Sequence, residues 1–245
     1  MFPLRDTVPS RSVPVVTWTL LVLNAVAWLY EPMVFDRLHG VRTIDPAFMS
    51  RYGLVPLKFF WYGEAHPFDW WGRFSPILTS MFLHASWMHF LGNMLFLWIF
   101  GDNVEDRLGK PRFVLFYLLC GTVAALIQTY LVPRSGVPMV GASGAIAGVL
   151  GSYFLFFPRA RVLTVVPIFF FIQVIEIPAF FFLGFWFLMQ FLSGAATVGD
   201  AGNGGGVAFG AHVGGFLAGL VLGPLLARRT ARKATYPTRE VFHPW

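Results

Sequence analysis

Charged side chains are scarce in this chain of 245 residues. Asp, Glu, Lys and Arg together make up 12% of the sequence, whereas a soluble globular protein contains about 25%. Hydrophobic residues reach 56%, and the mean hydropathy is +0.64. The composition therefore excludes an ordinary soluble domain and predicts one integral membrane domain.

Cysteine is also nearly absent, since Cys120 is the only one. A single cysteine excludes a disulfide within the chain and a cysteine-rich metal site. The sequence has no H-E-x-x-H motif for a zinc protease, and its apolar runs hold no pair of aspartates for an aspartyl protease. We therefore expect neither a metal site nor a cofactor.

Long apolar runs, in contrast, are plentiful. A hydrocarbon core about 30 Å thick needs about 20 helical residues for each crossing. The chain has six apolar segments that approach this length, which predicts an all-α, polytopic bundle of six transmembrane helices. Their approximate bounds are 14–32, 76–100, 113–132, 143–157, 163–193 and 209–227.

The distribution of Lys and Arg predicts the topology. Six crossings place both termini on one side of the membrane, and most of the 18 Lys and Arg fall on that side. The positive-inside rule then predicts a cytoplasmic head at 1–13, a membrane domain at 14–227 and a basic cytoplasmic tail at 228–245. Because the net charge of +6 follows from this topology, the expected partner is the lipid bilayer and not nucleic acid. The sequence predicts no particular oligomeric state.

Two external loops have unusual compositions. The first, at 33–75, is long and carries Trp61, Trp70 and Trp71, so we expect part of it to lie in the membrane interface. The last contains the glycine-rich stretch at 199–206. Glycine gives the backbone freedom, so this stretch is a candidate gate beside the sixth segment, with the fifth segment as the alternative.

The stretch "VGASGAIAG" places Ser143 at the start of the fourth apolar segment. A helix from Ser143 to the residue before Pro158 would be about 22 Å long, against a hydrocarbon core of about 30 Å. Ser143 would then lie below the outer surface, reached through non-helical backbone. Such backbone is tolerated at that depth only where protein or a water-filled cavity surrounds it.

A packing role for Ser143 is the alternative. Gly144 and Gly148 form a G-xxx-G pair, and Gly215 and Gly219 form another in the sixth segment. Small residues at this spacing let helices approach closely, and a serine among them often only packs. The hydrolase elbow G-x-S-x-G is not matched either, since its last glycine is replaced here by alanine and no strand is expected before it.

Polar residues on two other segments favour chemistry. His212 lies near the outer start of the sixth segment, and ionisable residues within membrane spans are costly and usually functional. The fourth and sixth segments are expected to run parallel, which puts Ser143 and His212 at equal depth as nucleophile and base. His89 and Asn93 share one face of the second segment. No carboxylate is placed to orient His212, so the pattern favours a Ser-His dyad over a triad.

Three stretches resemble motifs of the rhomboid intramembrane serine proteases. They are "HASWMHFLGNMLFLWIFGDNVEDRLG", "GASGAIAG" and "AHVGGFLAG", in the family's order. The resemblance implies a rhomboid-like six-helix bundle in which Ser143 is the nucleophile and His212 the general base. It assigns oxyanion and substrate binding to His89 and Asn93, together with Gly141 and Gly144 beside the serine.

The resemblance also implies substrates and a location. Expected substrates are transmembrane proteins, especially single-pass ones, cut in a bacterial inner membrane by a site that opens to the outer face. The alternatives are an inactive rhomboid-like protein that binds membrane clients, and a small transporter. Neither repeats nor an ionic pathway support a transporter.

Two positions depart from the family pattern. Pro76 stands where many members carry an arginine in the first loop, and Arg73 lies three residues earlier. Ala147 stands where some members carry a tyrosine that stacks on the catalytic histidine. What orients His212 is therefore left open by the sequence.

Overall fold

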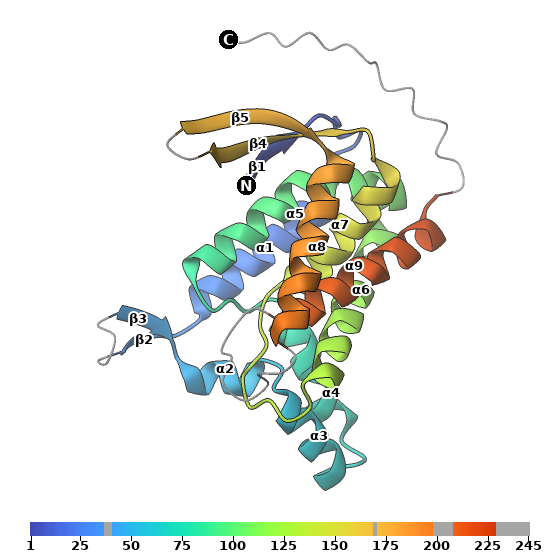
Figure 1. Cartoon of the computed structure of the whole chain (residues 1–245). Helices are drawn as coiled ribbons and strands as arrows, with labels where there is room; N and C mark the ends of the chain where they lie inside the picture. The colour runs from blue at the N-terminus through green and yellow to red at the C-terminus, as the bar shows by residue number, and fades with distance from the viewer. Residues whose placement is uncertain (37–40, 169–170, 198–207, 229–245) are drawn as a thin grey trace.

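The helices α1, α5, α6, α7, α8 and α9 form one bundle in the computed structural model, which describes residues 1–36, 41–168, 171–197 and 208–228 (Figure 1). Three of them, α6, α8 and α9, are long and apolar enough to cross a membrane, and α1 and α7 are shorter apolar helices. These helices identify an integral membrane protein. The bounds are α1 Val15–Tyr30, α5 Trp87–Leu108, α6 Lys110–Leu131, α7 Ser143–Phe156, α8 Ala179–Thr197 and α9 Phe209–Leu226.

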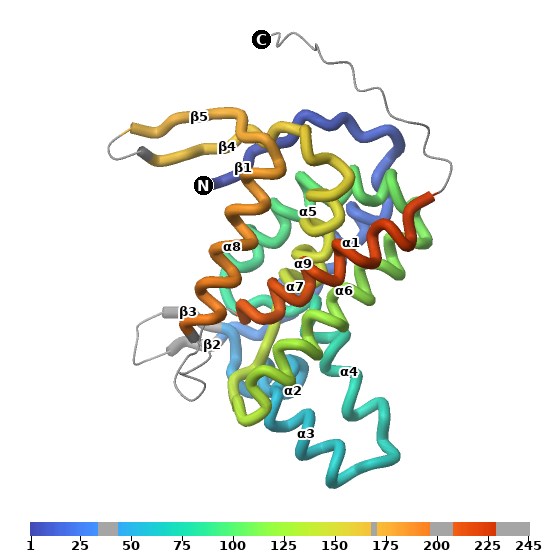
Figure 2. Tube along the Cα trace, turned by 45° about the vertical axis from the view of Figure 1, so that its right-hand side comes forward, coloured from blue at the N-terminus to red at the C-terminus, as the bar shows by residue number. Residues whose placement is uncertain are grey.

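The closest backbone contact between helices of the bundle is that of α7 with α9. A Cβ added at Gly215 would lie 2.0 Å from the carbonyl oxygen of Gly144, and one added at Gly219 would lie 1.9 Å from that of Gly148. Both glycine pairs advance by four residues in the same direction, so the helices run parallel, as the sequence predicts. The missing side chains let the two backbones touch. Figure 2 shows α9 crossing the bundle beside α7 and α6.

The helix α7 is the centre of the bundle. Every residue from Gly144 to Tyr153 is buried, so neighbours cover it on all sides. The main hydrophobic core surrounds it, with side chains such as Phe100 of α5 and Tyr117 of α6 fully enclosed. The element that begins with Ser143 is therefore held rigidly.

The helix α5 caps the first helix of the chain. Pro14 precedes α1 and offers no capping side chain, which leaves the first amides of α1 without an acceptor of their own. The buried carboxylate of Glu105 accepts hydrogen bonds from the backbone N–H groups of Val16 (3.1 Å) and Thr17 (2.8 Å). It also accepts one from the Thr17 hydroxyl at 2.8 Å. A residue late in α5 thus stabilises the start of α1.

The predicted second segment is wrong in its bounds. Instead of one helix over 76–100, the helix α4 (Trp70–Ser80) ends and α5 begins only at Trp87. The cause is local, because the Ser86 hydroxyl accepts a hydrogen bond from the N–H of His89 at 3.2 Å and so starts a new helix.

The predicted fifth segment is also wrong in its first half. Residues that were expected to be helical form an antiparallel hairpin of β4 (Arg161–Ile168) and β5 (Phe171–Pro178), and β1 (Phe2–Asp6) pairs with β4. β-branched residues make up at least half of each strand and favour extended backbone. The helix α8 begins only after this hairpin, at Ala179. Glu176, expected inside a helix, pairs with Arg161 at 3.2 Å across the hairpin.

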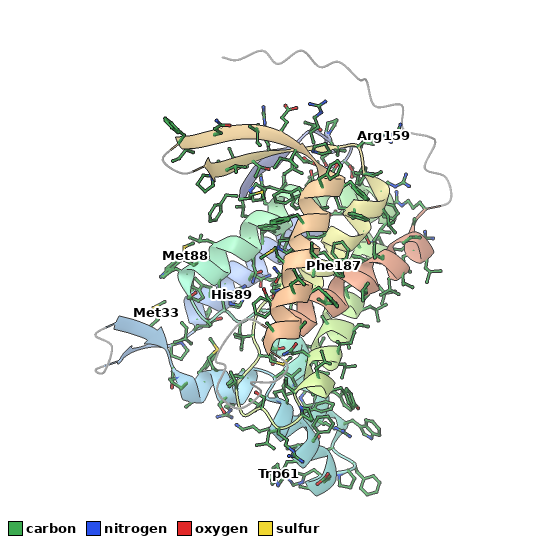
Figure 3. The ribbon with its side chains drawn as sticks, viewed as in Figure 1. Met33, Trp61, Met88, His89, Arg159 and Phe187 are labelled. Carbon is green, nitrogen blue, oxygen red and sulfur yellow. The ribbon has the colours of Figure 1, made fainter. Side chains whose placement is uncertain are left out.

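The sheet and the first external loop lie at opposite ends of the bundle. The sheet lies beside the N-terminus, and the loop elements gather at the far end (Figure 1). Figure 3 places Arg159 at the sheet end and Trp61 at the loop end. The loop holds the strands β2 (Met33–Asp36) and β3 (Val41–Ile44) and the helices α2 (Pro46–Tyr52) and α3 (Pro56–Ala65).

Arg73 anchors the first external loop. Its guanidinium group lies 4.6 Å from the ring centroid of Phe59, so a cation–π contact joins α4 to α3. Trp61, Trp70 and Trp71 are exposed, and their place in the membrane interface stays a prediction. The glycine-rich stretch at 199–206 and the tail beyond Arg228 lie outside the described residues.

Candidate active site

Ser143 and His212 meet at the start of two parallel helices. Ser143 is the first residue of α7, and His212 lies in the first turn of α9. The Ser143 Oγ and the His212 Nε2 are 2.8 Å apart, a hydrogen-bonding distance. The glycine contacts between α7 and α9 fix this register, because Gly144 and Gly215 each lie within one turn of the pair.

The other ring nitrogen of His212 has a partner that the sequence reasoning missed. The His212 Nδ1 lies 2.7 Å from the Oε1 of Gln190, which comes from α8. The indole of Trp186, one turn earlier in α8, lies 5.8 Å from the imidazole between ring centroids. A search for carboxylates alone could not find this contact. An uncharged polar residue deep in an apolar segment was the available signal.

Gly141 brings the backbone before the serine against His89 and Asn93. Its φ of +123° lies in the left-handed region, which glycine adopts without strain. A Cβ added there would lie 2.6 Å from the His89 Nε2 and 3.5 Å from the Asn93 Nδ2. The N–H of Gly141 donates to the carbonyl of Ser80 at 2.9 Å. Both the conformation and the space at this position require glycine.

Hydrogen-bond donors gather around this backbone. His89 and Asn93 lie one turn apart on α5, and Figure 3 shows His89 on the side of α5 toward the bundle. The Asn93 Nδ2 is buried without a hydrogen-bond partner among the described residues. Ser143, as the first residue of α7, has an N–H without an acceptor inside its helix. The arrangement can offer these donors to a bound anion.

Gly144 makes packing contacts. A Cβ added there would lie 2.7 Å from the Cβ of Ala124 in α6. Its predicted part in substrate binding stays a prediction. Cys120 is buried and lies next to Gly148, and among the described residues no group of three His, Cys, Asp or Glu could hold a metal ion.

One known protein family matches the part of the chain that contains this site. The family model of the Rhomboid domain matches residues 68–229, which include all of the site described above. The chain belongs to the rhomboid family. The resemblance seen in the three sequence motifs is thereby confirmed.

Several curated rhomboids are similar to this one. A protein of Bacillus subtilis named "Putative rhomboid protease YdcA" is 36% identical over 143 residues, 58% of this chain and 62% of the relative. Rhomboid protein 1, mitochondrial, of Saccharomyces cerevisiae is 31% identical over 163 residues, 64% of this chain and 43% of the relative. Rhomboid-like protein 11, chloroplastic, of Arabidopsis thaliana is 42% identical over 83 residues, 34% of this chain and 28% of the relative. The chain thus spans less than two thirds of the length of each of these rhomboids.

Proposed function

We propose that this rhomboid is an intramembrane serine endopeptidase that hydrolyses peptide bonds in or near the transmembrane segments of membrane proteins. One observation carries the proposal, namely the 2.8 Å hydrogen bond between Ser143 and His212 within a membrane bundle. A nucleophile and a base in direct contact are the minimum that covalent catalysis by serine requires.

The reaction begins with proton transfer. The neutral imidazole of His212 takes the hydroxyl proton through Nε2 while the Ser143 Oγ attacks the carbonyl carbon of the scissile bond. His212 then returns this proton to the nitrogen of the leaving amine as the C–N bond breaks, which leaves an acyl-enzyme. A water molecule, deprotonated by the same imidazole, then attacks the ester carbonyl. The bond between the acyl carbon and the Ser143 Oγ breaks, the imidazole returns the proton to this oxygen, and the carboxylic acid product leaves.

The donors beside Gly141 stabilise the tetrahedral intermediate. The N–H of Ser143 and the side chains of His89 and Asn93 bind the oxyanion. A buried donor without a partner, such as the Asn93 Nδ2, costs about 1–3 kcal/mol in the resting protein. That cost is understandable where the donor serves an anion that forms only during catalysis. Each donor of this kind contributes about 2.7–4 kcal/mol to the transition state.

The substrate must present extended backbone to Ser143. A membrane helix hides its carbonyl groups in its own hydrogen bonds, so segments with helix-weakening residues are preferred. The predicted topology, six helices with cytoplasmic termini, would put the site on the outer half of the membrane. The relatives come from a bacterium, mitochondria and a chloroplast. A bacterial inner membrane stays a prediction, as do single-pass substrates.

Cleavage by the purified protein tests the proposal. The protein is reconstituted into liposomes with a panel of single-pass membrane proteins, and the fragments are mapped by mass spectrometry. We expect cleavage by the wild type, slow cleavage by Asn93→Ala and none by Ser143→Ala. A fluorophosphonate should label the wild type at Ser143. The alternative, an inactive client-binding rhomboid, predicts neither labelling nor cleavage, and equal cleavage by Ser143→Ala would contradict a serine mechanism.

A further inference from the structure

The contact between Gln190 and His212 carries an inference that rests on the proposed function. We propose that Gln190 is a positioning residue that holds the imidazole of His212 in the tautomer needed for catalysis and ties this base to the position of α8. The observation behind it is the 2.7 Å distance between the His212 Nδ1 and the Gln190 Oε1.

The chemistry of the two groups determines the tautomer. The Oε1 of a glutamine can only accept a hydrogen bond, so the Nδ1 of His212 must carry the proton. A neutral imidazole has one N–H, and its Nε2 is then left with a lone pair. This lone pair points at Ser143, whose hydroxyl can donate to it over 2.8 Å. The bond to Gln190 therefore sets the base in the form that can accept the serine proton.

A neutral amide suits this place in the bundle. In a catalytic triad an aspartate accepts from the Nδ1 and fixes the same tautomer. A carboxylate within the membrane would cost much more free energy than an amide, because ionised groups are poorly solvated there. Gln190 supplies the acceptor without the charge, which explains why the chain needs no acidic residue beside His212.

The same helix also supplies the wall against which the imidazole packs. Trp186 lies four residues before Gln190 and therefore on the same face of α8. Its ring centroid is 5.8 Å from that of His212, with an angle of 35° between the planes. Ala147 cannot stack on the imidazole, so α8 takes over the orientation of the ring through Trp186 and Gln190 together.

The helix α8 is the least enclosed of the three long apolar helices among the described residues. Buried residues make up 17% of its apolar window, compared with 39% for α6 and 33% for α9. The middle of α8 contacts α9 through side chains, such as Phe187 against Phe216 with ring centroids 4.7 Å apart, while its backbone approaches α9 at Gly194. Figure 3 shows Phe187 at the middle of α8, on its side toward α9. A movement of α8 away from α9 separates Gln190 from His212, so the base is correctly set only when α8 is in place.

A pair of near-isosteric substitutions tests the inference. Gln190→Glu keeps an oxygen that accepts from the Nδ1, whereas Gln190→Met keeps the length of the side chain without an acceptor. Two rates are measured on the full chain in liposomes. The rate of fluorophosphonate labelling reports the reactivity of Ser143, and kcat and KM for a cleaved transmembrane substrate report the whole reaction.

We expect Gln190→Met to lower both the labelling rate and kcat on the order of 100-fold, the lower end of what a positioned base contributes, with KM unchanged. Gln190→Glu should stay within a few-fold of the wild type, because in this apolar place its side chain is the neutral acid, whose carbonyl oxygen accepts from the Nδ1 as the amide does. Phe191→Leu is the matched control, since Phe191 is the next residue of α8 and is exposed. It should leave both rates unchanged.

The outcomes separate this inference from the proposed function. Equal rates for Gln190→Met and the wild type would overturn the inference, as would equal losses in Gln190→Met and Gln190→Glu. Thermal unfolding in detergent shows whether each variant is folded, and a loss of rate with a loss of fold in Gln190→Met alone would also count against it. A wild-type protein that neither labels nor cleaves would instead overturn the proposed function.

Discussion

The helix α9 contacts two of its neighbours, α7 and α8, in opposite ways. Toward α7 the backbones touch at Gly215 and Gly219, and the carbonyl oxygens of α7 lie within 2.0 Å of where a Cβ would be. Toward α8 the contact runs largely through side chains such as Phe187 against Phe216, and a Cβ added at Gly194 of α8 would lie 3.9 Å from the nearest backbone atom of α9. One side fixes the distance between Ser143 and His212, and the other leaves room for adjustment.

This difference has a physical basis. A backbone-to-backbone contact has no rotamers through which to relax, whereas aromatic rings can shift and repack. The nucleophile and the base therefore share the rigid side. The groups that orient the base, Gln190 and Trp186, come from the adjustable side.

The largest expected effect comes from adding one methyl group to the rigid side. Gly219→Ala places a Cβ 1.9 Å from the carbonyl oxygen of Gly148, and neither backbone can move away without separating the helices. We expect a loss of about 3 kcal/mol or more of unfolding free energy, and loss of activity. The measurement is thermal unfolding in detergent, together with fluorophosphonate labelling.

Gly194→Ala is the matched control on the adjustable side. Its Cβ would lie 3.2 Å from that of Phe209 and 3.9 Å from the nearest backbone atom of α9, a contact that a shift of a few tenths of an ångström relieves, so stability should change by less than about 1 kcal/mol. Similar unfolding temperatures for Gly219→Ala and Gly194→Ala would contradict the contrast between the two sides of α9.

An engineered, reversible disulfide between α8 and α9 tests the adjustable side directly. A Cβ at Gly194 would lie 3.2 Å from that of Phe209, close to the spacing of about 3.8 Å in disulfides. The fifth segment, α8, is a candidate gate for a transmembrane substrate, and the link would hold it against α9. In the double variant Gly194→Cys and Phe209→Cys, oxidation should therefore reduce cleavage of such a substrate to the level of Ser143→Ala. Labelling by the small fluorophosphonate should persist, since Gln190 stays beside His212.

Reduction of the same sample is the control. It should restore cleavage to the level of the reduced double variant before oxidation, because only the link has changed. Cys120 is buried and should not exchange with the new pair. Cleavage that is equal before and after oxidation would mean that α8 need not move to admit the substrate.

A smaller effect is expected at Asp6 of β1, whose carboxylate is hydrogen-bonded to α7 and α5. The Tyr153 hydroxyl of α7 donates to Asp6, and the Asn103 Nδ2 of α5 donates to the same carboxylate at 3.0 Å. Burial raises the pKa of Asp6 from 3.8 to about 6 despite these hydrogen bonds. The folded protein therefore binds this proton more tightly than the unfolded chain does, and stability falls as the pH rises from about 4 to about 6.

Asp6→Asn should remove this contribution. The expected difference in pH dependence between the wild type and the variant is on the order of 2 kcal/mol across that window, with no further change above it. Unfolding is followed in detergent at several pH values between 4 and 8. Parallel pH profiles for the two proteins would show that Asp6 keeps an ordinary affinity for its proton in the folded state.

The sequence predicted the rigid side better than the adjustable one. Helices α7 and α9 begin at Ser143 and Phe209 as expected, because glycine pairs and flanking polar residues mark them. The hairpin before α8 was missed because apolar content alone does not distinguish a strand from a buried helix. Its β-branched residues were the available signal. Gln190 was missed because its partner depends on how α8 packs, which no local pattern records.

The capping of α1 by Glu105 bears on the order of assembly. During synthesis α1 emerges first, yet the acceptor for its initial amides lies 88 residues beyond Thr17. The N–H groups of Val16 and Thr17 therefore lack this acceptor until most of α5 has been synthesised. The carboxylate of Glu105 in turn is buried, and its hydrogen bonds among the described residues come from α1. Each of these two helices completes the other, so their predicted cytoplasmic ends form a natural first point of assembly for a chain inserted from its N-terminus.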